Sequence, residues 1–203
     1  MNSNSELIRH LINRGALSSK NIIEAFENID RADFVYDPSV SDVYEDYPLQ
    51  IGYGQTISQP TTVAMMLEML SPRKGQKILD IGSGSGWTTA LLSFIVGDKG
   101  SVTGLERVEE LVKYGKINLE KYGLYNSTII QAGDALGIVG EEFDRILVSA
   151  AADKFPTELL EQLKIGGRLV IPVGNSIYEV TKKENGEYES IEHYGFTFVP
   201  LIY

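Results

Sequence analysis

The sequence of 203 residues contains no cysteine and only two histidines. Without cysteine the chain has no disulfide, no zinc–thiolate site and no cysteine nucleophile. His10 and His193 lie far apart in the sequence, so we interpret each as a surface or packing residue, and no metal site is predicted. A serine-hydrolase motif is also missing, because Ser83 and Ser85 lack glycines at the two positions that a nucleophile elbow requires.

Long apolar runs and dense basic clusters are missing as well. No apolar run approaches the ~20 residues that span a bilayer, and the first ten residues lack the basic start and apolar centre of a signal peptide. The net charge is −10, and basic clusters are no larger than pairs such as Lys182-Lys183. Since binding to phosphates needs a dense basic surface, we expect a cytoplasmic protein with neither nucleic acid nor membrane as a partner.

The composition is that of a globular domain, 43% hydrophobic and 23% charged. In the first third, apolar residues recur at helical spacing from Leu7 to Ile12 and again from Ile22 to Ile29, where Ser18-Ser19 can cap the second helix. A third helix is predicted from Pro60, with four apolar side chains on one face: Val63, Met66, Leu67 and Leu70.

From Lys77 onward, predicted strands alternate with predicted helices. The strands are "KILDI", "SVTGLE", "STIIQA" and "GGRLVIPVG", and the helices are "WTTALLSFIV", "VEELVKYGKINLEKYG" and "PTELLEQL". This order favours a Rossmann-like, doubly wound α/β fold with a mostly parallel sheet. The tail differs: Asn185-Gly186 lies between two strand patterns, which predicts a final antiparallel hairpin, expected beside the active site.

The strongest local motif is "ILDIGSGSGW", from Ile78 to Trp87. A buried strand ends at Asp80, and three alternating glycines allow the backbone to turn tightly and to approach a ligand. The dinucleotide fingerprint needs its third glycine where Trp87 stands, which disfavours a nicotinamide oxidoreductase. The G-x-G-x-G form resembles motif I of S-adenosylmethionine-dependent methyltransferases. We expect Asp80 to order the amides of this turn and to belong to the cofactor site together with Gly82 and Gly84.

Two further acids follow later strands. Glu106 ends the second strand, 20 residues after Gly86, where a carboxylate can hold both ribose hydroxyls. Asp134, after the third strand, can accept a hydrogen bond from an adenine amine, or it can be an ordinary loop aspartate that caps a turn. A glycine turn with no ligand is the remaining alternative, and the combined pattern predicts a nucleotide-like ligand.

The run "YEDYPLQIGYGQTISQP", with "ILDIGSGSGW", "FDRILVSAAA", "LLEQLKIGGRLVIPVG" and "FVPL", resembles the protein-L-isoaspartate (D-aspartate) O-methyltransferase family over nearly the whole chain. The resemblance implies one methyltransferase domain over 1–203, with N-terminal helices and a substrate-side loop in 1–76 and the cofactor-binding core in 77–203. It implies S-adenosyl-L-methionine as cofactor and damaged proteins or peptides with isoaspartyl residues as partners. Their methyl esters would close to a succinimide, which reopens partly to aspartate.

The resemblance also implies roles for individual residues. Ser58 corresponds to the active-site serine, and Gln55, Thr56 and Ile57 belong to the same loop, which touches cofactor and substrate. The further cofactor contacts implied are Ser83, Glu106, Arg107, Asp134 and Ala135. Local sequence alone favours another role for Ser58, in which it caps the helix at Pro60 by accepting from the amide of Thr61.

The chain departs from the family pattern at Trp87 and Ala135, where Tyr and Gly are usual, and at Ile29-Asp30-Arg31, where Val-Pro-Arg is usual. The glutamine that commonly follows the Pro-Val-Gly motif is also missing after Gly174. Two alternatives stay open beside the family reading. One is a methyltransferase of the same fold that acts on another carboxylate or on a small molecule, and the other is a cofactor-binding protein without turnover.

Overall fold

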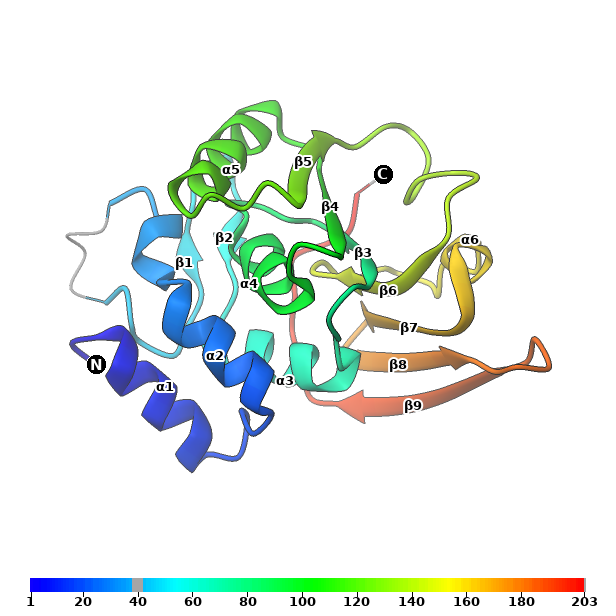
Figure 1. The fold of residues 1–203 in the computed structure, drawn as a ribbon, viewed down its shortest axis with the longest axis horizontal. Coiled ribbons are helices and arrows are strands. Elements are labelled where there is room, and N and C mark those ends of the chain that lie inside the picture. Colours follow the sequence, from blue (N-terminus) through cyan, green and yellow to red (C-terminus); the bar gives the residue numbers. More distant parts are fainter. Residues whose placement is uncertain (38–41, 203) are drawn as a thin grey trace.

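A sheet of seven strands forms the centre of the computed structural model, which describes residues 1–37 and 42–202 (Figure 1). The strand order is β5-β4-β3-β6-β7-β8-β9. The first five strands in this order are parallel, and β8 and β9 are antiparallel. The strands are β3 (Lys77–Ile81), β4 (Ser101–Glu106), β5 (Ser127–Gln131), β6 (Phe143–Val148), β7 (Leu163–Val173), β8 (Ser176–Lys182) and β9 (Tyr188–Tyr194).

The helices are α1 (Asn4–Asn13), α2 (Lys20–Asn28), η1 (Arg31–Phe34), α3 (Pro60–Leu70), α4 (Trp87–Val96), α5 (Glu109–Lys121) and α6 (Glu158–Glu161). Figure 1 shows α2 beside α4, on the same side of the sheet. One cluster of buried apolar side chains joins the helices α1 to α5 to the sheet, and a second cluster lies on its other face around α6. Neighbouring residues of β3, such as Ile78 and Leu79, point into different clusters, as the pleat of a strand requires.

The predicted fold class and helices are confirmed, with two local corrections. Ser19 stands at the N-cap of α2, but it accepts no hydrogen bond there, and its hydroxyl donates to Glu68 Oε2 at 2.5 Å. The helix predicted from "PTELLEQL" is reduced to the four residues of α6. The reason is that the chain enters β7 directly afterwards, where the amide of Phe143 donates to the carbonyl of Gln162 at 2.8 Å.

The antiparallel hairpin of β8 and β9 is confirmed, but its position differs from the prediction. Its turn is closed by the amide of Gly186, which donates to the carbonyl of Lys183 at 2.9 Å. Because Ser176 pairs with Val173 while Thr181 pairs with Arg168, this turn points away from the carboxyl ends of the parallel strands. The chain after β9, and not the hairpin itself, returns to those ends, and it pairs with Ala151.

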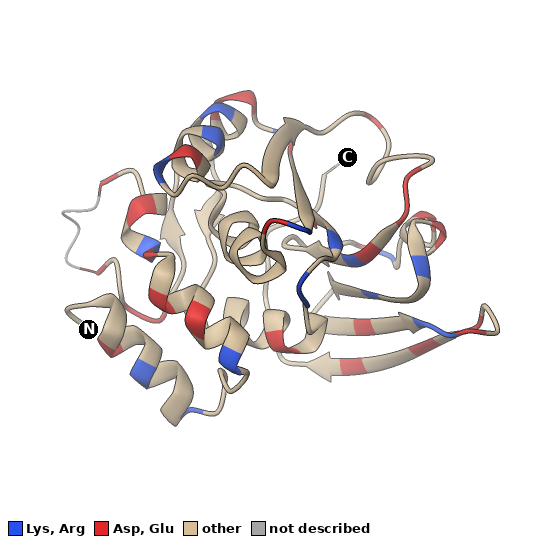
Figure 2. Ribbon diagram, in the orientation of Figure 1, with Lys and Arg blue, Asp and Glu red and all other residues tan. Residues whose placement is uncertain are grey.

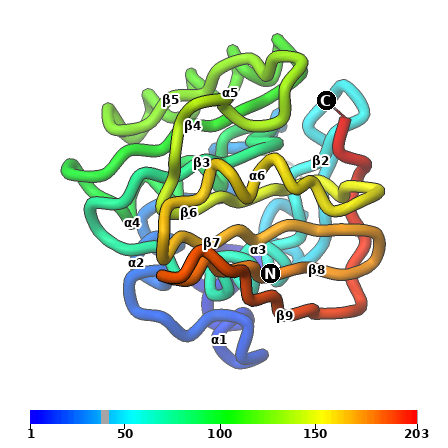
Figure 3. The backbone as a smooth tube through the Cα atoms, turned by 90° about the vertical axis from the view of Figure 1, so that its right-hand side faces the viewer, coloured from blue at the N-terminus to red at the C-terminus, as the bar shows by residue number. Residues whose placement is uncertain are grey.

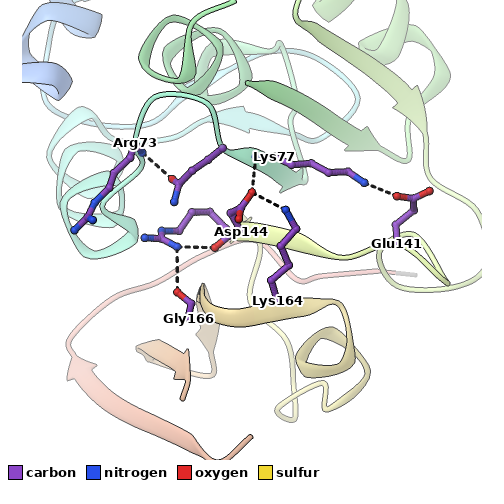
Figure 4. A network of polar contacts seen from close by, with 8 residues as sticks. Arg73, Lys77, Glu141, Asp144, Lys164 and Gly166 are labelled. Carbon is purple, nitrogen blue, oxygen red and sulfur yellow. Dashed lines mark hydrogen bonds and ion pairs between the residues drawn. The ribbon is translucent and has the colours of Figure 1, made fainter. Parts of the chain in front are cut away.

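Charged side chains connect the amino ends of the strands, at the opposite edge of the sheet (Figure 4). Asp144 Oδ2 accepts from the amide of Lys77 at 2.8 Å and from the ammonium group of Lys164 at 3.0 Å. Lys77 also pairs with Glu141. Figure 2 shows that acidic residues are also spread over α2, α5 and the β8–β9 hairpin. This network lies at the edge opposite the carboxyl ends of the strands, where open α/β folds usually bind their ligands.

Candidate active site

The polar loop that precedes α3 contains a short hairpin. Its strands are β1 (Leu49–Gln50) and β2 (Thr56–Ile57), which pair antiparallel. The turn between them has positive φ at Gly52, Tyr53 and Gly54. Glycine favours this backbone region, which explains two of the three residues. The hairpin leads directly into Ser58 and then into α3.

The glycine-rich turn after β3 lies against this hairpin. Gly82, Gly84 and Gly86 all have positive φ, between 53° and 91°. A Cβ atom on Gly84 would lie 3.2 Å from Cδ1 of Ile51, so the glycine turn and the residue that follows β1 are in close contact. The cofactor motif and the substrate-side loop, which are separate in the sequence, therefore form one wall.

A cavity of about 290 Å³ opens at this wall, at the carboxyl edge of the sheet. Eight residues that were predicted for the site line this cavity. They come from the loop and from the strand ends: Gln55, Thr56, Ser58, Gly82, Gly84, Glu106, Arg107 and Ala135. Its size and mixed polar and apolar lining are those of a pocket for a small organic ligand. The structure thus brings together most of the predicted site.

Glu106 is the acid of this cavity. Its side chain is 7% exposed, and its carboxylate accepts from the amide of Gly84 at 2.8 Å and from the amide of Val108 at 2.9 Å. A carboxylate has about four lone-pair positions, so both oxygens keep capacity for a ligand's hydroxyl groups. Glu106 therefore orders the glycine turn and can bind a diol at the same time.

Asp80 was expected to order the amides of the turn, and this expectation is wrong. Its side chain is fully buried behind the cavity, and Oδ2 accepts from the hydroxyls of Thr88 and Thr89, each at 2.7 Å. Burial raises the pKa of Asp80 to about 6, and the negative charge of Glu106 acts in the same direction. Asp80 thus connects β3 to the first turn of α4, and Glu106 performs the role that was predicted for it.

Two predicted residues lie one layer deeper. Ser83 and Ile57 line a small cavity of about 30 Å³ between the loop and the start of α4, beside Ser58. Within the part of the chain that the structure describes, Ser83 Oγ and the indole nitrogen of Trp87 are buried without a hydrogen-bond partner. Buried polar groups without a partner in a protein commonly mark a missing ligand or water. The small cavity shares Thr56, Ser58, Gly82, Gly84 and Ser149 with the main one, so these two groups lie next to the main cavity.

Asp134 does not line the main cavity among the described residues. It lies in a neighbouring groove, which it shares with Ala135 and with four further acids: Glu141, Glu142, Glu158 and Glu161. Ala135 and Leu136 line both spaces, so Asp134 stands at the border of the cavity rather than in it.

Ser58 does not cap α3, so the capping interpretation is wrong. The N-cap position belongs to Gln59, and the amide of Thr61 donates to Asp46 Oδ1 at 2.9 Å. The hydroxyl of Thr61 donates to the other oxygen of Asp46 at 2.6 Å. The helix end is satisfied by Asp46, and Ser58 lines the cavity instead.

The opposite wall of the cavity is not predicted from the sequence. The segment Val199–Ile202 lines the cavity, and so does Ser149 at the end of β6. The amide of Ala151 donates to the carbonyl of Val199 at 2.8 Å, which holds the segment there. Figure 3 shows this C-terminal segment beside the β1–β2 hairpin. The signal that could have found Ser149 is its position after β6, the strand next to β3 in the sheet.

The cavity fits a nucleoside that carries a polar tail. Glu106 can bind ribose hydroxyls, the glycine turn lets backbone approach the ligand, and the orphan groups of Ser83 and Trp87 suit the tail. In the described ranges no group of three or more His, Asp or Glu side chains is arranged to hold a metal ion. The carboxylate of Glu106, the glycine turn and the two groups without a partner together suit S-adenosylmethionine.

Comparison with known proteins gives consistent results. A profile of the protein-L-isoaspartate(D-aspartate) O-methyltransferase family matches residues 2–203. The protein-L-isoaspartate O-methyltransferase of Pyrococcus abyssi is 42% identical over 201 residues, which are 96% of this chain and 92% of the relative. The Methanopyrus kandleri enzyme of the same name is 41% identical and covers 97% of this chain and 89% of its own.

The fold also has a solved counterpart. A crystallised protein-L-isoaspartate O-methyltransferase from Plasmodium falciparum, in complex with S-adenosyl-L-homocysteine, superposes with a TM-score of 0.88. The match is at 27% identity and covers 100% of this chain and 99% of that chain.

Proposed function

Because the chain belongs to the protein-L-isoaspartate(D-aspartate) O-methyltransferase family, we propose that it transfers a methyl group from S-adenosylmethionine to the carboxylate of L-isoaspartyl and D-aspartyl residues in damaged proteins and peptides. The observation that carries the proposal is that Ser58 and Glu106, which come from separate parts of the sequence, line one cavity. Ser58 belongs to the acceptor side of the cavity, and Glu106 belongs to the cofactor side. Transfer needs both in a single space.

On the cofactor side, Glu106 binds the ribose hydroxyls, with Gly82 and Gly84 as the close backbone wall. Arg107 and Ala135, which line the same cavity, would contact the bound nucleoside, and Asp134 would contribute from the border of the cavity. Ser83, beside Ile57, binds at the tail, while Asp80 acts from behind by holding α4. When bound, S-adenosylmethionine supplies an electrophilic methyl group on sulfur.

On the acceptor side, Ser58 orients the attacking carboxylate, with Gln55 and Thr56 beside it. A carboxylate with an ordinary pKa of about 4 is ionised at neutral pH, so the site needs no general base. The remaining work is placement of the oxygen in line with the methyl group and exclusion of water. The hydroxyl of Ser58 can donate one hydrogen bond to the acceptor without being consumed.

The partner is an isoaspartyl polypeptide, and we place the protein in the cytoplasm. No helix among the described residues has both the length and the apolar character that a membrane crossing requires. The net charge of −10 disfavours nucleic acid as a partner. The cavity is partly open to solvent, and Ser58 and the Val199–Ile202 segment both line it, so a polypeptide acceptor can reach it from outside.

The experiment that tests the proposal compares two peptides of the same sequence, one with L-isoaspartate and one with normal aspartate. We expect methyl transfer to the isoaspartyl peptide and at most a trace to its twin. Equal transfer to both, or transfer only to small carboxylates, would indicate a methyltransferase with another acceptor. Binding of S-adenosylhomocysteine without any transfer would indicate a cofactor-binding protein.

Two variants test which side of the cavity each residue serves, by peptide methylation and by S-adenosylhomocysteine binding. Ser58→Ala should lower turnover by about 10²-fold, because placement is the main source of acceleration, and should leave S-adenosylhomocysteine affinity nearly intact. Glu106→Ala should weaken that affinity, since hydrogen bonds to a charged group contribute about 1.5–3 kcal/mol each. Unchanged turnover in the first variant, or unchanged affinity in the second, would remove that residue from the proposed site.

A further inference from the structure

Arg31 is a fully buried arginine in the wall behind the active-site loop. It is 0% exposed and begins η1, which is separated from α2 by Ile29 and Asp30. A buried charge is costly unless hydrogen bonds satisfy it. The partners of its guanidinium group therefore show what the residue does.

These partners are backbone carbonyls from both ends of the substrate-side loop. Nη1 donates to the carbonyl of Val43 and, at 3.4 Å, to that of Glu45. Nη2 donates to the carbonyls of Tyr47 at 3.0 Å and of Ser58 at 3.3 Å. The first three lie before the β1–β2 hairpin, and Ser58 follows it. One guanidinium group thus closes the loop at its base and touches the backbone of the residue that faces the acceptor.

The same group also touches the cofactor side. The guanidinium carbon of Arg31 lies 5.6 Å from the centroid of the Trp87 ring, within the range of a cation–π contact. Trp87 is the first residue of α4, directly after Gly86 of the glycine turn. Burial lowers the pKa of Arg31 to about 10, with Asp46 acting in the opposite direction, so the group stays charged at neutral pH.

We propose that Arg31 is a positioning residue, which sets Ser58 and its loop at a fixed distance from the glycine turn. This inference rests on the proposed function, because it concerns the acceptor side of the same site. An arginine suits this position, since its two Nη nitrogens donate to four carbonyls from a fixed fork, whereas lysine offers three donors on a single nitrogen. Arg31 acts through the backbone of Ser58 and through the ring of Trp87, and it does not line the described cavity.

The test compares Arg31→Lys and Arg31→Met with Arg14→Met, which removes an exposed arginine at the end of α1. We expect kcat for the isoaspartyl peptide to fall about tenfold or more in Arg31→Met and by less in Arg31→Lys, because a small misplacement is costly in an aligned transfer. Affinity for S-adenosylhomocysteine should change by less than about threefold, since Glu106 and the turn remain. Arg14→Met should match the wild-type protein in every measurement.

Two readouts do not depend on activity. Amide hydrogen exchange in residues 42–61 should become faster in Arg31→Lys, while exchange in β3 and β6 stays unchanged. The emission of Trp87, the single tryptophan, should shift in both Arg31 variants and not in Arg14→Met. Arg31→Lys keeps the charge, so it serves if Arg31→Met does not fold.

The positioning role would be overturned if Arg31→Lys had the same turnover and the same amide exchange as the wild-type protein. It would also be overturned if Arg31→Met folded, kept its full kcat and differed only in a lower melting temperature. If the wild-type protein transfers no methyl group to the peptide, the proposed function fails. In that case the comparison of amide hydrogen exchange in residues 42–61 still tests whether Arg31 holds this loop in place.

Discussion

Two carboxylates at the ends of neighbouring strands, Asp80 and Glu106, have different environments. Glu106 accepts from two backbone amides at the edge of the cavity, whereas Asp80 is buried and accepts from two threonine hydroxyls. Burial, assisted by the charge of Glu106, raises the pKa of Asp80 from 3.8 to about 6. The folded protein therefore keeps a proton on Asp80 up to a higher pH than the unfolded chain does.

This difference predicts a pH effect for Asp80→Asn. Between about pH 4 and pH 6 the folded state binds a proton that the unfolded state has lost, so the wild-type free energy of unfolding falls as pH rises through this window. The variant lacks this titration. The stability of the variant relative to the wild type should therefore rise by up to about 3 kcal/mol from pH 4 to pH 7. Urea unfolding at several pH values measures it, and a constant difference would contradict the assignment.

Individual site residues could be predicted where a motif and a strand end coincide. Glu106, Gly82 and Gly84 were found in this way, because the carboxyl ends of parallel strands share one edge. The partners of Asp80 could not be predicted, since hydroxyls of α4 and amides of the turn are equally near in the sequence. The role of Arg31 could not be predicted, because its partners are backbone carbonyls, which every residue has and which therefore leave no pattern in the sequence. In the sequence Arg31 stands out only as part of a departure from the family pattern.

At the scale of secondary structure, the start of α3 depends on a residue outside the helix. Asp46 accepts from both the amide and the hydroxyl of Thr61. Burial alone would raise the pKa of Asp46, but the hydrogen bonds from Thr61 hold it below its ordinary value. Asp46 thus serves as the cap of α3 and fixes the loop that precedes it.

Replacing this cap should cost stability. Asp46→Ala should lower the free energy of unfolding by about 0.5–2 kcal/mol, which is the usual effect of removing a cap. Because the pKa of Asp46 is lowered in the folded state, its contribution is present above about pH 4 and is lost as pH falls below that value. Thermal unfolding at pH 7 measures the loss. Ser58→Ala is the control, and an equal loss there would restore the capping interpretation of Ser58.

The elements themselves were predictable to different degrees. The strands β3 and β4 and the helix α4 were predicted with their observed bounds, because their apolar patterns are strong and their ends carry glycine or acidic residues. The length of α6 was not predictable. The side chain of Gln162 accepts from the amide of Ile138 at 2.8 Å and donates to the carbonyl of Leu136 at 2.9 Å, so tertiary contacts end the helix.

At the scale of the whole molecule, the N-terminal helices and the α/β core share one interior. Leu7 of α1 and Ile177 of β8 belong to the same cluster of buried side chains. The rings of Phe26 and Trp87 meet edge to face at 5.5 Å between α2 and α4. We propose that residues 1–203 form a single domain, in which the substrate-side part does not fold apart from the cofactor-binding part.

A single domain predicts a single unfolding transition. Trp87 reports on the contact between the two parts, and far-ultraviolet circular dichroism reports on all helices and strands. The two signals should change with the same midpoint in urea. Leu11→Ala, in the buried face of α1, should lower both midpoints together. Separate midpoints would instead show that the N-terminal helices unfold as an independent unit.

The central claim is that this chain starts the repair of isoaspartyl residues by methylating their carboxylate. The most direct measurement follows a pure isoaspartyl peptide over time with the protein and excess S-adenosylmethionine, and separates it from its aspartyl form by chromatography. We predict that the isoaspartyl peptide declines while the normal aspartyl peptide accumulates, as the methyl ester closes to a succinimide and reopens. Ser58→Ala should slow this conversion by about 10²-fold. A peptide that stays isoaspartyl throughout, while the protein binds S-adenosylhomocysteine normally, would contradict the claim.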